Sequence, residues 1–186
     1  MVTWESLEQT CANCSKCALC QSRNNVVFGI GSKTADIMFV GEGPGEQEDL
    51  QGEPFVGAAG KLLDDMLSII DIDRTSCYIA NIVKCRPPHN RDPEDSEQDA
   101  CIEYLHNQIL LLRPKMIVCL GRIAARRLID SDFRITKEHG MWYQYNGIWI
   151  TGLYHPSALL RDPSKRPETF VDLLMIRDKL HHLRNQ

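Results

Sequence analysis

Four cysteines stand at every third position in the decapeptide CANCSKCALC, which spans residues 11–20. They make up half of the eight cysteines in the chain. Two thiolates that are separated by two residues can converge on one ion or cluster, so this spacing favours a metal or cluster site. A disulfide framework and a chance enrichment of cysteine are the alternatives.

The properties of the whole chain bear on that choice. A length of 186 residues suffices for one domain whose core needs no covalent staples. The sequence opens without the basic segment and apolar run of a signal peptide. No apolar stretch approaches the ~20 residues that span a bilayer. We therefore expect a cytoplasmic protein without membrane contact, whose reduced thiols disfavour the disulfide framework.

The charge of the chain gives a mixed indication about nucleic acid. The formal net charge is −4, which on average disfavours such a partner, but binding depends on the local surface. Basic residues do gather in three groups: Lys84, Arg86 and Arg91; Arg122, Arg126 and Arg127; and Arg161, Lys165 and Arg166. Solvated faces are the plain alternative for these groups.

The elements that must position any site follow from the apolar pattern. Apolar runs predict buried strands at 35–41, 77–83 and 115–121, and further strands at about 143–146 and 148–154. Helical spacing is found at 58–70, 95–112, 122–130 and 168–183. Strands that alternate with helices predict an α/β layer structure with a mostly parallel sheet, here as one domain over residues 1–186. Ligands of such sheets bind at the carboxyl ends of the strands.

The first strand runs into GEGPGEQED, residues 41–49. Its glycines let the backbone approach a ligand and offer N–H groups to it. The lysine and hydroxyl residue of a phosphate loop are missing. Acidic side chains beside exposed N–H groups suit a neutral ligand with carbonyl groups, or chemistry that develops positive charge. A plain glycine-rich turn is the alternative.

Two further residues with polar side chains lie in or after apolar strands. Asn81 interrupts an apolar strand, and a buried carboxamide must be paired, either structurally or with the donor–acceptor edge of a nucleobase. His155 leaves a strand end, where its ring could donate a hydrogen bond to a developing anion. The following Leu159 and Leu160 are core residues or wedges of the kind that nucleic-acid proteins insert between bases.

Taken together, these stretches resemble the fourth family of uracil-DNA glycosylases, the iron–sulfur group. The resemblance covers nearly the whole chain and rests on five motifs in order: the cysteine pair leading to VVFG (26–29), GEGPGEQED (41–49), GEPFVG (52–57), NIVKCRPP (81–88) and HPSALLR (155–161). It implies a single-domain three-layer sandwich with a four-stranded, mostly parallel sheet flanked by helices. It also implies a [4Fe–4S] cluster and removal of uracil from single- or double-stranded DNA. We expect a monomer.

The resemblance also implies the cluster ligands. In the family register a Cys-x-x-Cys pair precedes a leucine and an arginine, which selects Cys14 and Cys17, and the second pair is Cys85 and Cys101. An iron–sulfur loop would thus be formed by 11–20 and 85–101, leaving four extra thiols: Cys11, Cys20, Cys77 and Cys119. A local ferredoxin-like site on all four cysteines of 11–20 is a rival, although its last gap is one residue short and its proline is missing. Zinc is an alternative occupant, because four thiolates suit either.

Roles in uracil binding are carried over from the family in the same way. Phe55 would stack on uracil, and Asn81 would pair with its O4 and N3–H edge. Backbone N–H groups around Gly41–Gly43 and the ring of His155 would meet the O2 side. Glu42 would balance the sugar cation and hold the attacking water.

The best-known family of these enzymes reads GlyGlnAspProTyr at the first motif. Gly43 here stands where that family has its water-orienting aspartate, and Gly45 where it has its thymine-excluding tyrosine. Glu42 and Glu48 are the candidates for these two roles.

The contacts to DNA and the reaction type complete the prediction. Arg86 and Arg161 would face phosphates, and Leu159 would act as the wedge, with Leu160 as alternate. No lysine occupies an obvious nucleophile position, so we expect a monofunctional enzyme that leaves an abasic site for base excision repair. A non-catalytic, metal-stabilised DNA-binding module is the alternative. A crosslinking relative is disfavoured, because its histidine-containing insertion is missing from 84–93.

Overall fold

The computed structural model describes residues 2–186. Its helices and helical turns, in chain order, are α1 (Trp4–Ala12), η1 (Ala18–Gln21), α2 (Glu46–Gln51), α3 (Ala58–Ile69), η2 (Pro88–Asn90), α4 (Asp95–Leu112), α5 (Arg122–Leu128), α6 (Ile135–Glu138), α7 (Pro156–Arg161), η3 (Pro163–Lys165) and α8 (Arg166–Arg184). Its strands are β1 (Ile30–Gly31), β2 (Ile37–Gly41), β3 (Tyr78–Asn81), β4 (Met116–Leu120), β5 (Trp142–Tyr145) and β6 (Ile148–Leu153).

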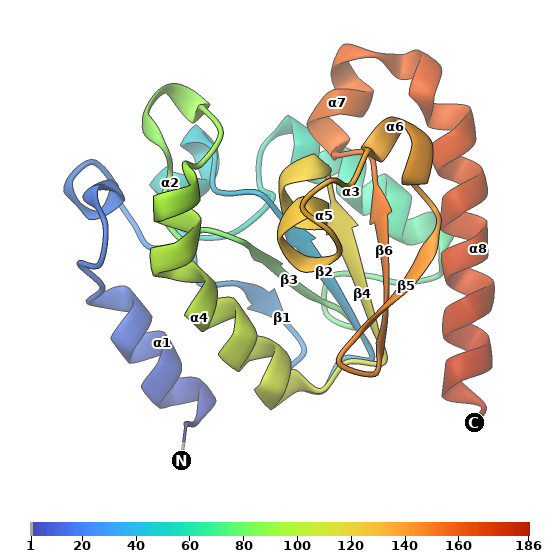
Figure 1. Cartoon of the computed structure of the whole chain (residues 1–186), viewed down its shortest axis with the longest axis horizontal. Helices are drawn as coiled ribbons and strands as arrows, with labels where there is room; N and C mark the ends of the chain where they lie inside the picture. The colour runs from blue at the N-terminus through green and yellow to red at the C-terminus, as the bar shows by residue number, and fades with distance from the viewer. Residues whose placement is uncertain (1) are drawn as a thin grey trace.

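One six-stranded sheet runs through the middle of the molecule (Figure 1), in the order β1-β3-β2-β4-β6-β5. The four central strands are parallel, as predicted, and β1 and β5 add an antiparallel edge on either side. The sheet has six strands rather than the four that the family resemblance implied, and the turn before β6 explains the extra strand β5. Asn146 and Gly147 both have positive φ angles, of 49° and 84°, and such a two-residue turn folds β5 back onto β6 as a hairpin.

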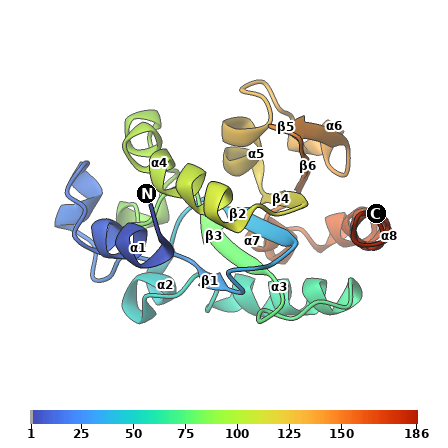
Figure 2. The same cartoon turned by 90° about the horizontal axis from the view of Figure 1, so that it is seen from below.

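Helices cover both faces of the sheet, which gives three layers. Seen from below, α1, α4 and α5 lie on one side of the strands and α3, α7 and α8 on the other (Figure 2). Successive residues of a strand point to opposite faces. In β2, Met38 and Val40 pack in the core on the α4 side, while Ile37 and Phe39 pack on the α3 side. Burial on both faces explains why these strands are apolar throughout rather than alternating.

The predicted elements agree well with the structure at the centre of the fold. Helix α4 has the predicted bounds, and β2, β3 and β4 lie within the predicted strands. The short helices α1, α2 and α7 were not predicted. No helix among residues 2–186 combines the length and apolar character that crossing a membrane requires.

The parallel arrangement places four strand ends at one edge of the sheet. Gly41 ends β2 beside Asn81, which ends β3. The pairing continues a little further, because the Ile82 and Val83 N–H groups donate to the Gly41 and Glu42 carbonyls at 2.9 and 3.1 Å. The loops after β2, β3, β4 and β6 therefore meet at this edge, where ligands of α/β sheets bind.

Candidate active site

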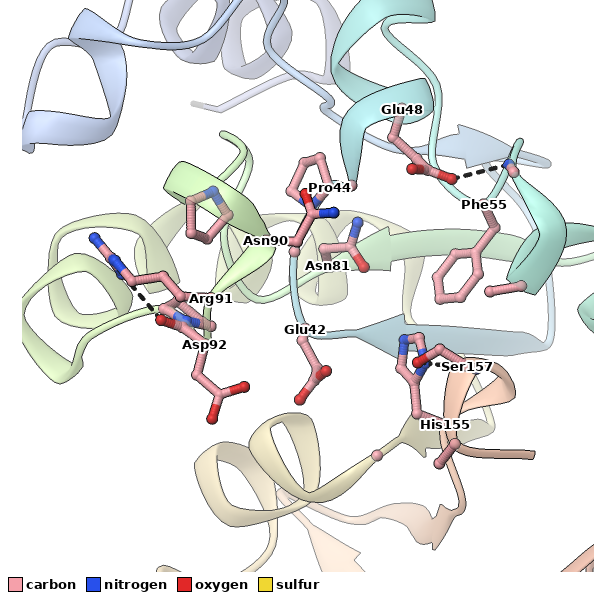
Figure 3. A pocket seen from close by; sticks show the side chains of 18 of the residues that line it. Glu42, Pro44, Glu48, Phe55, Asn81, Asn90, Arg91, Asp92, His155 and Ser157 are labelled. Atoms are coloured by element: carbon pink, nitrogen blue, oxygen red, sulfur yellow. Dashed lines mark hydrogen bonds between the residues drawn. The ribbon is translucent and has the colours of Figure 1, made fainter. Parts of the chain in front are cut away.

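A cavity of about 670 Å³ opens at these strand ends, and we call it the strand-end cavity. Figure 3 shows side chains from the separate loops pointing into it. The residues predicted from the sequence that line it are Glu42, Gly43, Glu48, Phe55, Asn81, His155 and Arg161. Residues from the segment between β2 and α3, from the end of β3 and from the segment after β6 are thus brought together at one place.

Gly41 at the end of β2 and Gly43 in the following loop lack side chains, and neighbouring side chains fill the space beside them. A Cβ on Gly41 would clash with Asn81 Oδ1 and would lie 2.7 Å from Phe55 Cζ. A Cβ on Gly43 would lie 2.7 Å from a methyl group of Val83. Side chains at these positions are therefore blocked by neighbouring groups, of which Asn81 and Phe55 line the cavity.

Asn81 is buried, with 2% of its surface exposed. Its Oδ1 has no hydrogen-bond partner within residues 2–186. Almost all buried polar atoms in folded proteins are paired, so an unpartnered amide oxygen in a cavity wall calls for a donor from outside the protein. Its main-chain carbonyl is held by the ammonium group of Lys84 at 3.0 Å.

The ring of His155 is fixed in one tautomer by Ser157. The Ser157 N–H donates to Nδ1 at 3.1 Å, and the Ser157 hydroxyl lies 2.7 Å from the same nitrogen. A nitrogen that accepts from a backbone N–H carries no proton, so the neutral ring carries its proton on Nε2. His155 thus offers an N–H donor on the side of the ring away from Ser157.

The electrostatic surroundings keep this ring neutral. Burial, helped by the positive charge of Arg161, lowers the pKa of His155 to about 4, although Glu48 acts in the opposite direction. The ring also stacks on Phe55, with centroids 5.6 Å apart and planes inclined by 29°. A neutral ring with its proton on Nε2 can donate to a developing anion without first taking up a second proton.

Glu42 provides the carboxyl group of the cavity. Burial is the main cause that raises its pKa, and the carboxylate of Asp92 raises it further, whereas Arg122 and Arg161 lower it. Figure 3 places Glu42 among Asp92, Asn81 and His155. A buried carboxyl group with a raised pKa, facing other polar side chains in a cavity, is typical of a functional site.

Glu48 holds the loop that carries Phe55. Its Oε1 accepts the Val56 and Gly57 N–H groups, each at 3.0 Å. A Cβ on Gly45 would lie 2.8 Å from the other carboxylate oxygen. The carboxylate of Glu48 therefore fills the space next to Gly45, where the best-known family has a tyrosine.

The predicted DNA-contacting residues lie around this site in different ways. Leu159 is 2% exposed and packs in the core on the α3 side, so its side chain is not free to enter a duplex. Leu160 is 42% exposed, because the next residue of α7 points to solvent. Burial therefore argues against Leu159 as a wedge, and of the two leucines only Leu160, the predicted alternate, has an accessible side chain. Arg86 lies outside the cavity lining, and its Nε donates to Asn90 Oδ1 at 2.8 Å.

Six cysteines surround a second, small cavity of about 10 Å³, which we call the cysteine chamber. They come from α1, the following loop and η1, the loop after β3, and α4: Cys11, Cys14, Cys17, Cys20, Cys85 and Cys101. All four predicted ligands are among them. The chamber also has two of the extra thiols, whereas Cys77 and Cys119 are buried elsewhere in the core.

The cysteine chamber offers only thiol ligands, a donor set that suits either zinc or an iron–sulfur cluster. Arg23 Nη1 donates to Cys85 Sγ, and the Lys84 N–H donates to Cys101 Sγ, both at 3.3 Å. Such hydrogen bonds to sulfur are found around clusters. Burial raises the pKa of Cys101 to about 11, so a metal would have to displace the thiol proton. Among the described residues, no group of three or more His, Cys, Asp or Glu side chains meets the geometry of a metal site.

The sequence interpretation placed Lys84 in a basic group that could face nucleic acid, and it did not single out Ser157; the burial of Lys84 makes the first interpretation wrong. Lys84 is 1% exposed, and burial lowers its pKa to about 8. Its ammonium group also donates to Gln108 Oε1 at 2.7 Å. Ser157 could have been predicted from the sequence, because a serine two residues after His155 can hydrogen-bond back to it at the start of a helix.

Comparisons with known proteins agree with this arrangement. Residues 28–176 match the family model described as the uracil DNA glycosylase superfamily. A type-4 uracil-DNA glycosylase of Archaeoglobus fulgidus is 44% identical over 184 residues, 95% of this chain and 92% of that protein. A protein of the same name from Thermotoga maritima is 44% identical over 169 residues, 90% of this chain and 88% of that protein. The chain therefore belongs to the uracil DNA glycosylase superfamily and, within it, to the type-4 group.

Proposed function

We propose that this protein is a monofunctional uracil-DNA glycosylase that hydrolyses the N-glycosidic bond of deoxyuridine in DNA. It releases uracil and leaves an abasic site for base excision repair. The observation that carries the proposal is the unpartnered Oδ1 of Asn81 in the wall of the strand-end cavity. Family membership and the relatives' names support the same reaction.

The base would be read by the wall formed at the ends of β2 and β3. Asn81 Oδ1 accepts the N3–H of uracil, and its amide nitrogen donates to O4. Cytosine presents the opposite pattern, with an acceptor at N3 and an amino group at C4, so it is refused. Phe55 stacks on the extruded base, as enzymes that act on a flipped nucleotide require. The carboxylate of Glu48 stands next to Gly45 and is our candidate for excluding the methyl group of thymine.

The bond would be broken by charge stabilisation on its two sides. Negative charge flows onto uracil O2 as the C1′–N1 bond breaks, and the Nε2–H of His155 and the N–H groups near Gly41–Gly43 stabilise it. The sugar becomes cation-like, and the carboxylate of Glu42 stabilises that charge and holds the attacking water. No lysine is among the residues that line the strand-end cavity, in keeping with hydrolysis without a covalent intermediate.

DNA would be bound along the rim of the strand-end cavity. Arg161 lines the cavity, and Leu160 beside it is exposed, which suits a phosphate contact and a wedge respectively. Arg86 would add a phosphate contact next to the cysteine chamber. Contacts of this kind make binding weaken as salt concentration rises. A monomer is sufficient for this site, because each proposed group comes from one chain.

The cysteine chamber would hold a [4Fe–4S] cluster on Cys14, Cys17, Cys85 and Cys101. When bound, the cluster would cross-link the segment after α1 to the loop after β3 and to α4, and hydrolysis needs no electron from it. Arg23 and the Lys84 N–H would donate hydrogen bonds to the ligand sulfurs of Cys85 and Cys101. The non-catalytic binding module accounts for the chamber but gives no reason for Glu42, Asn81 and His155 to share one cavity.

The test is release of free uracil from single- and double-stranded oligonucleotides, comparing the protein with Asn81→Asp. We expect the unchanged protein to release uracil. Asn81→Asp should lower kcat/KM for uracil by about 100-fold or more, because a mispaired buried edge is strongly rejected. It should gain activity on cytosine. Asn107→Asp, in an exposed part of α4, is the matched control and should change neither.

Two results would count against the proposal. If the cluster-loaded protein released no uracil from either substrate, the binding-module alternative would stand. If Asn81→Asp kept full activity on uracil, the base would be read elsewhere in the strand-end cavity.

A further inference from the structure

Phe55 has an unusual backbone for an aromatic residue. Its φ angle is 53°, in the left-handed region that residues with a side chain rarely adopt. Its ring is 6% exposed and lies over Gly41 and against His155. A bulky residue stays in this region only where its surroundings hold it there.

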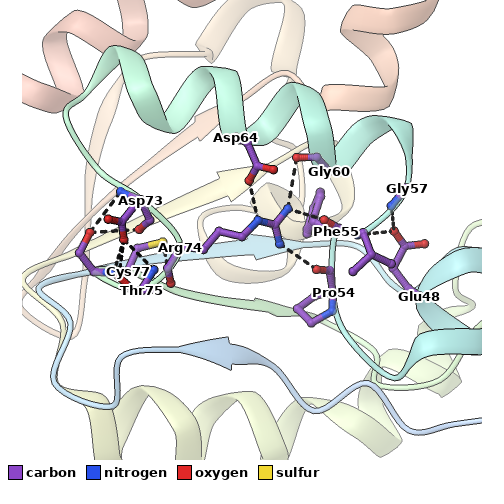
Figure 4. Close-up of polar contacts among 12 residues, drawn as sticks. Glu48, Pro54, Phe55, Gly57, Gly60, Asp64, Asp73, Arg74, Thr75 and Cys77 are labelled. Atoms are coloured by element: carbon purple, nitrogen blue, oxygen red, sulfur yellow. Dashed lines mark hydrogen bonds and ion pairs between the residues drawn. The ribbon is translucent and has the colours of Figure 1, made fainter.

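The guanidinium group of Arg74 supplies one such hold. Arg74 lies in the turn between α3 and β3, and it donates to three main-chain carbonyls around Phe55 (Figure 4). Nη1 donates to the Pro54 carbonyl at 3.1 Å, and Nη2 donates to the carbonyl of Phe55 itself and to that of Gly60 at 3.2 Å. A Cβ on Gly60 would clash with the Phe55 carbonyl, so α3 also packs directly against this peptide.

The arginine is itself held in place from both ends. Its Nε donates to Asp64 Oδ1 at 2.5 Å, which orients the guanidinium plane from α3. The turn around it is braced by Asp73 Oδ1, which accepts the Thr75 N–H at 2.8 Å and the Ser76 N–H at 3.1 Å. On the far side of Phe55, Glu48 accepts the next two N–H groups. The peptide of Phe55 is therefore fixed by Arg74 on one side and by Glu48 on the other.

We propose that Arg74 is a positioning residue for uracil excision: it holds the Phe55 backbone so that the ring presents its face to the base. This rests on the proposed function, in which Phe55 stacks on uracil. Arg74 does not line the strand-end cavity, so it would act through Phe55 and not by touching substrate. A lysine could not replace it fully, because one ammonium lacks the planar fork that reaches several carbonyls at once.

The first measurement tests the hold itself and needs no substrate. Amide hydrogen exchange is followed for residues 55–61 and for β4 in the unchanged protein, Arg74→Met and Arg74→Lys. We expect Arg74→Met to speed exchange in 55–61 by at least tenfold while β4 is unaffected, with Arg74→Lys in between. Arg177→Met, which removes an α8 arginine paired with its neighbour Asp178, is the matched control. Equal protection of 55–61 in all variants would overturn the proposal.

The second measurement links that hold to the reaction through a double-mutant cycle. Arg74→Met should lower kcat/KM for uracil release by about tenfold when Phe55 is present. In a Phe55→Ala background the same substitution should change kcat/KM by less than twofold, because residues that act through one another are not additive. Equal losses in both backgrounds would mean that Arg74 acts as a general structural residue, and the proposal would be wrong.

The two measurements also separate this proposal from the proposed function. If the unchanged protein released no uracil, the proposed function would fail, while the exchange data would still report on Arg74 and Phe55. If Phe55→Ala were as active as the unchanged protein, stacking by Phe55 would be wrong, and with it the link from Arg74 to the reaction. If Arg74→Met does not fold, Arg74→Lys supplies both measurements, with smaller expected losses in the same direction.

Discussion

The strand-end cavity and the cysteine chamber lie at the two ends of one short segment, Asn81–Cys85. They differ in how far the protein alone brings their side chains into the state that binding requires. In the strand-end cavity, His155 and Glu48 are already held by hydrogen bonds to the chain, and the Asn81 oxygen is left for a ligand. In the cysteine chamber, burial raises the pKa of Cys85 and Cys101, so their thiols are protonated without a metal. The strand-end cavity is therefore preformed, whereas the cysteine chamber would be completed only by the cluster that we propose for it.

The largest expected effect concerns which thiols complete the cysteine chamber. Cys101→Ser should abolish the visible absorption and iron content of the purified protein and lower its melting temperature by roughly 10 °C, because metal binding contributes directly to folding. Cys20→Ser should keep both iron and absorption. The measurements are iron analysis, absorption and thermal unfolding. The opposite pattern, with iron lost in Cys20→Ser and kept in Cys101→Ser, would favour the local ferredoxin-like site.

A smaller effect is expected where the strand-end cavity is preformed. His155→Ala should lower kcat for uracil release by about 100- to 1,000-fold, the usual loss when one donor to a developing anion is removed. Iron content should stay near that of the unchanged protein, since the cysteine chamber is separate. His181→Ala, on the exposed side of α8, is the control for single-turnover kinetics. A loss of iron in His155→Ala would show that the two regions are not independent.

The smallest effect should be seen in the pH dependence of the strand-end cavity. In the proposed mechanism Glu42 acts as a carboxylate, and burial raises its pKa above 4.5, so kcat/KM should fall as pH drops through that raised pKa. His155 stays neutral down to a pKa of about 4, so no separate step is expected near the ordinary histidine value of 6.5. Glu42→Gln should lower kcat roughly 10- to 50-fold and remove the acid limb. A limb near 6.5 that survives in Glu42→Gln would point to His155 instead.

The sequence predicts the centre of this molecule better than its edges. β2, β3 and β4 are buried on both faces, so their apolar runs stand out, and Asn81 is conspicuous because it interrupts one of them. The sequence predicts α7 less well. This helix has six residues, and the orientation of its one turn buries Leu159 and exposes Leu160. A turn of this length has too few residues for a periodic pattern.

The residues that hold others in place were harder to predict than those that face the cavity. Lysine is normally exposed, and the burial of Lys84 depends on Gln108 and on the Asn81 carbonyl, which tertiary packing brings to it. Arg74 contacts three main-chain carbonyls. Any residue has a carbonyl group, so such partners leave no pattern in the sequence.

The order of the strands along the chain has a consequence for synthesis. All four thiols proposed to bind the cluster, together with Glu42, Phe55 and Asn81, precede β4, whereas His155 follows β6. A chain emerging from the ribosome therefore contains all four proposed cluster ligands before His155, the proposed donor to the uracil anion, has been made. If the proposed cluster and the proposed role of His155 hold, cluster insertion could begin on a nascent chain that is still inactive, and excision would become possible only after β6 joins the sheet beside β4.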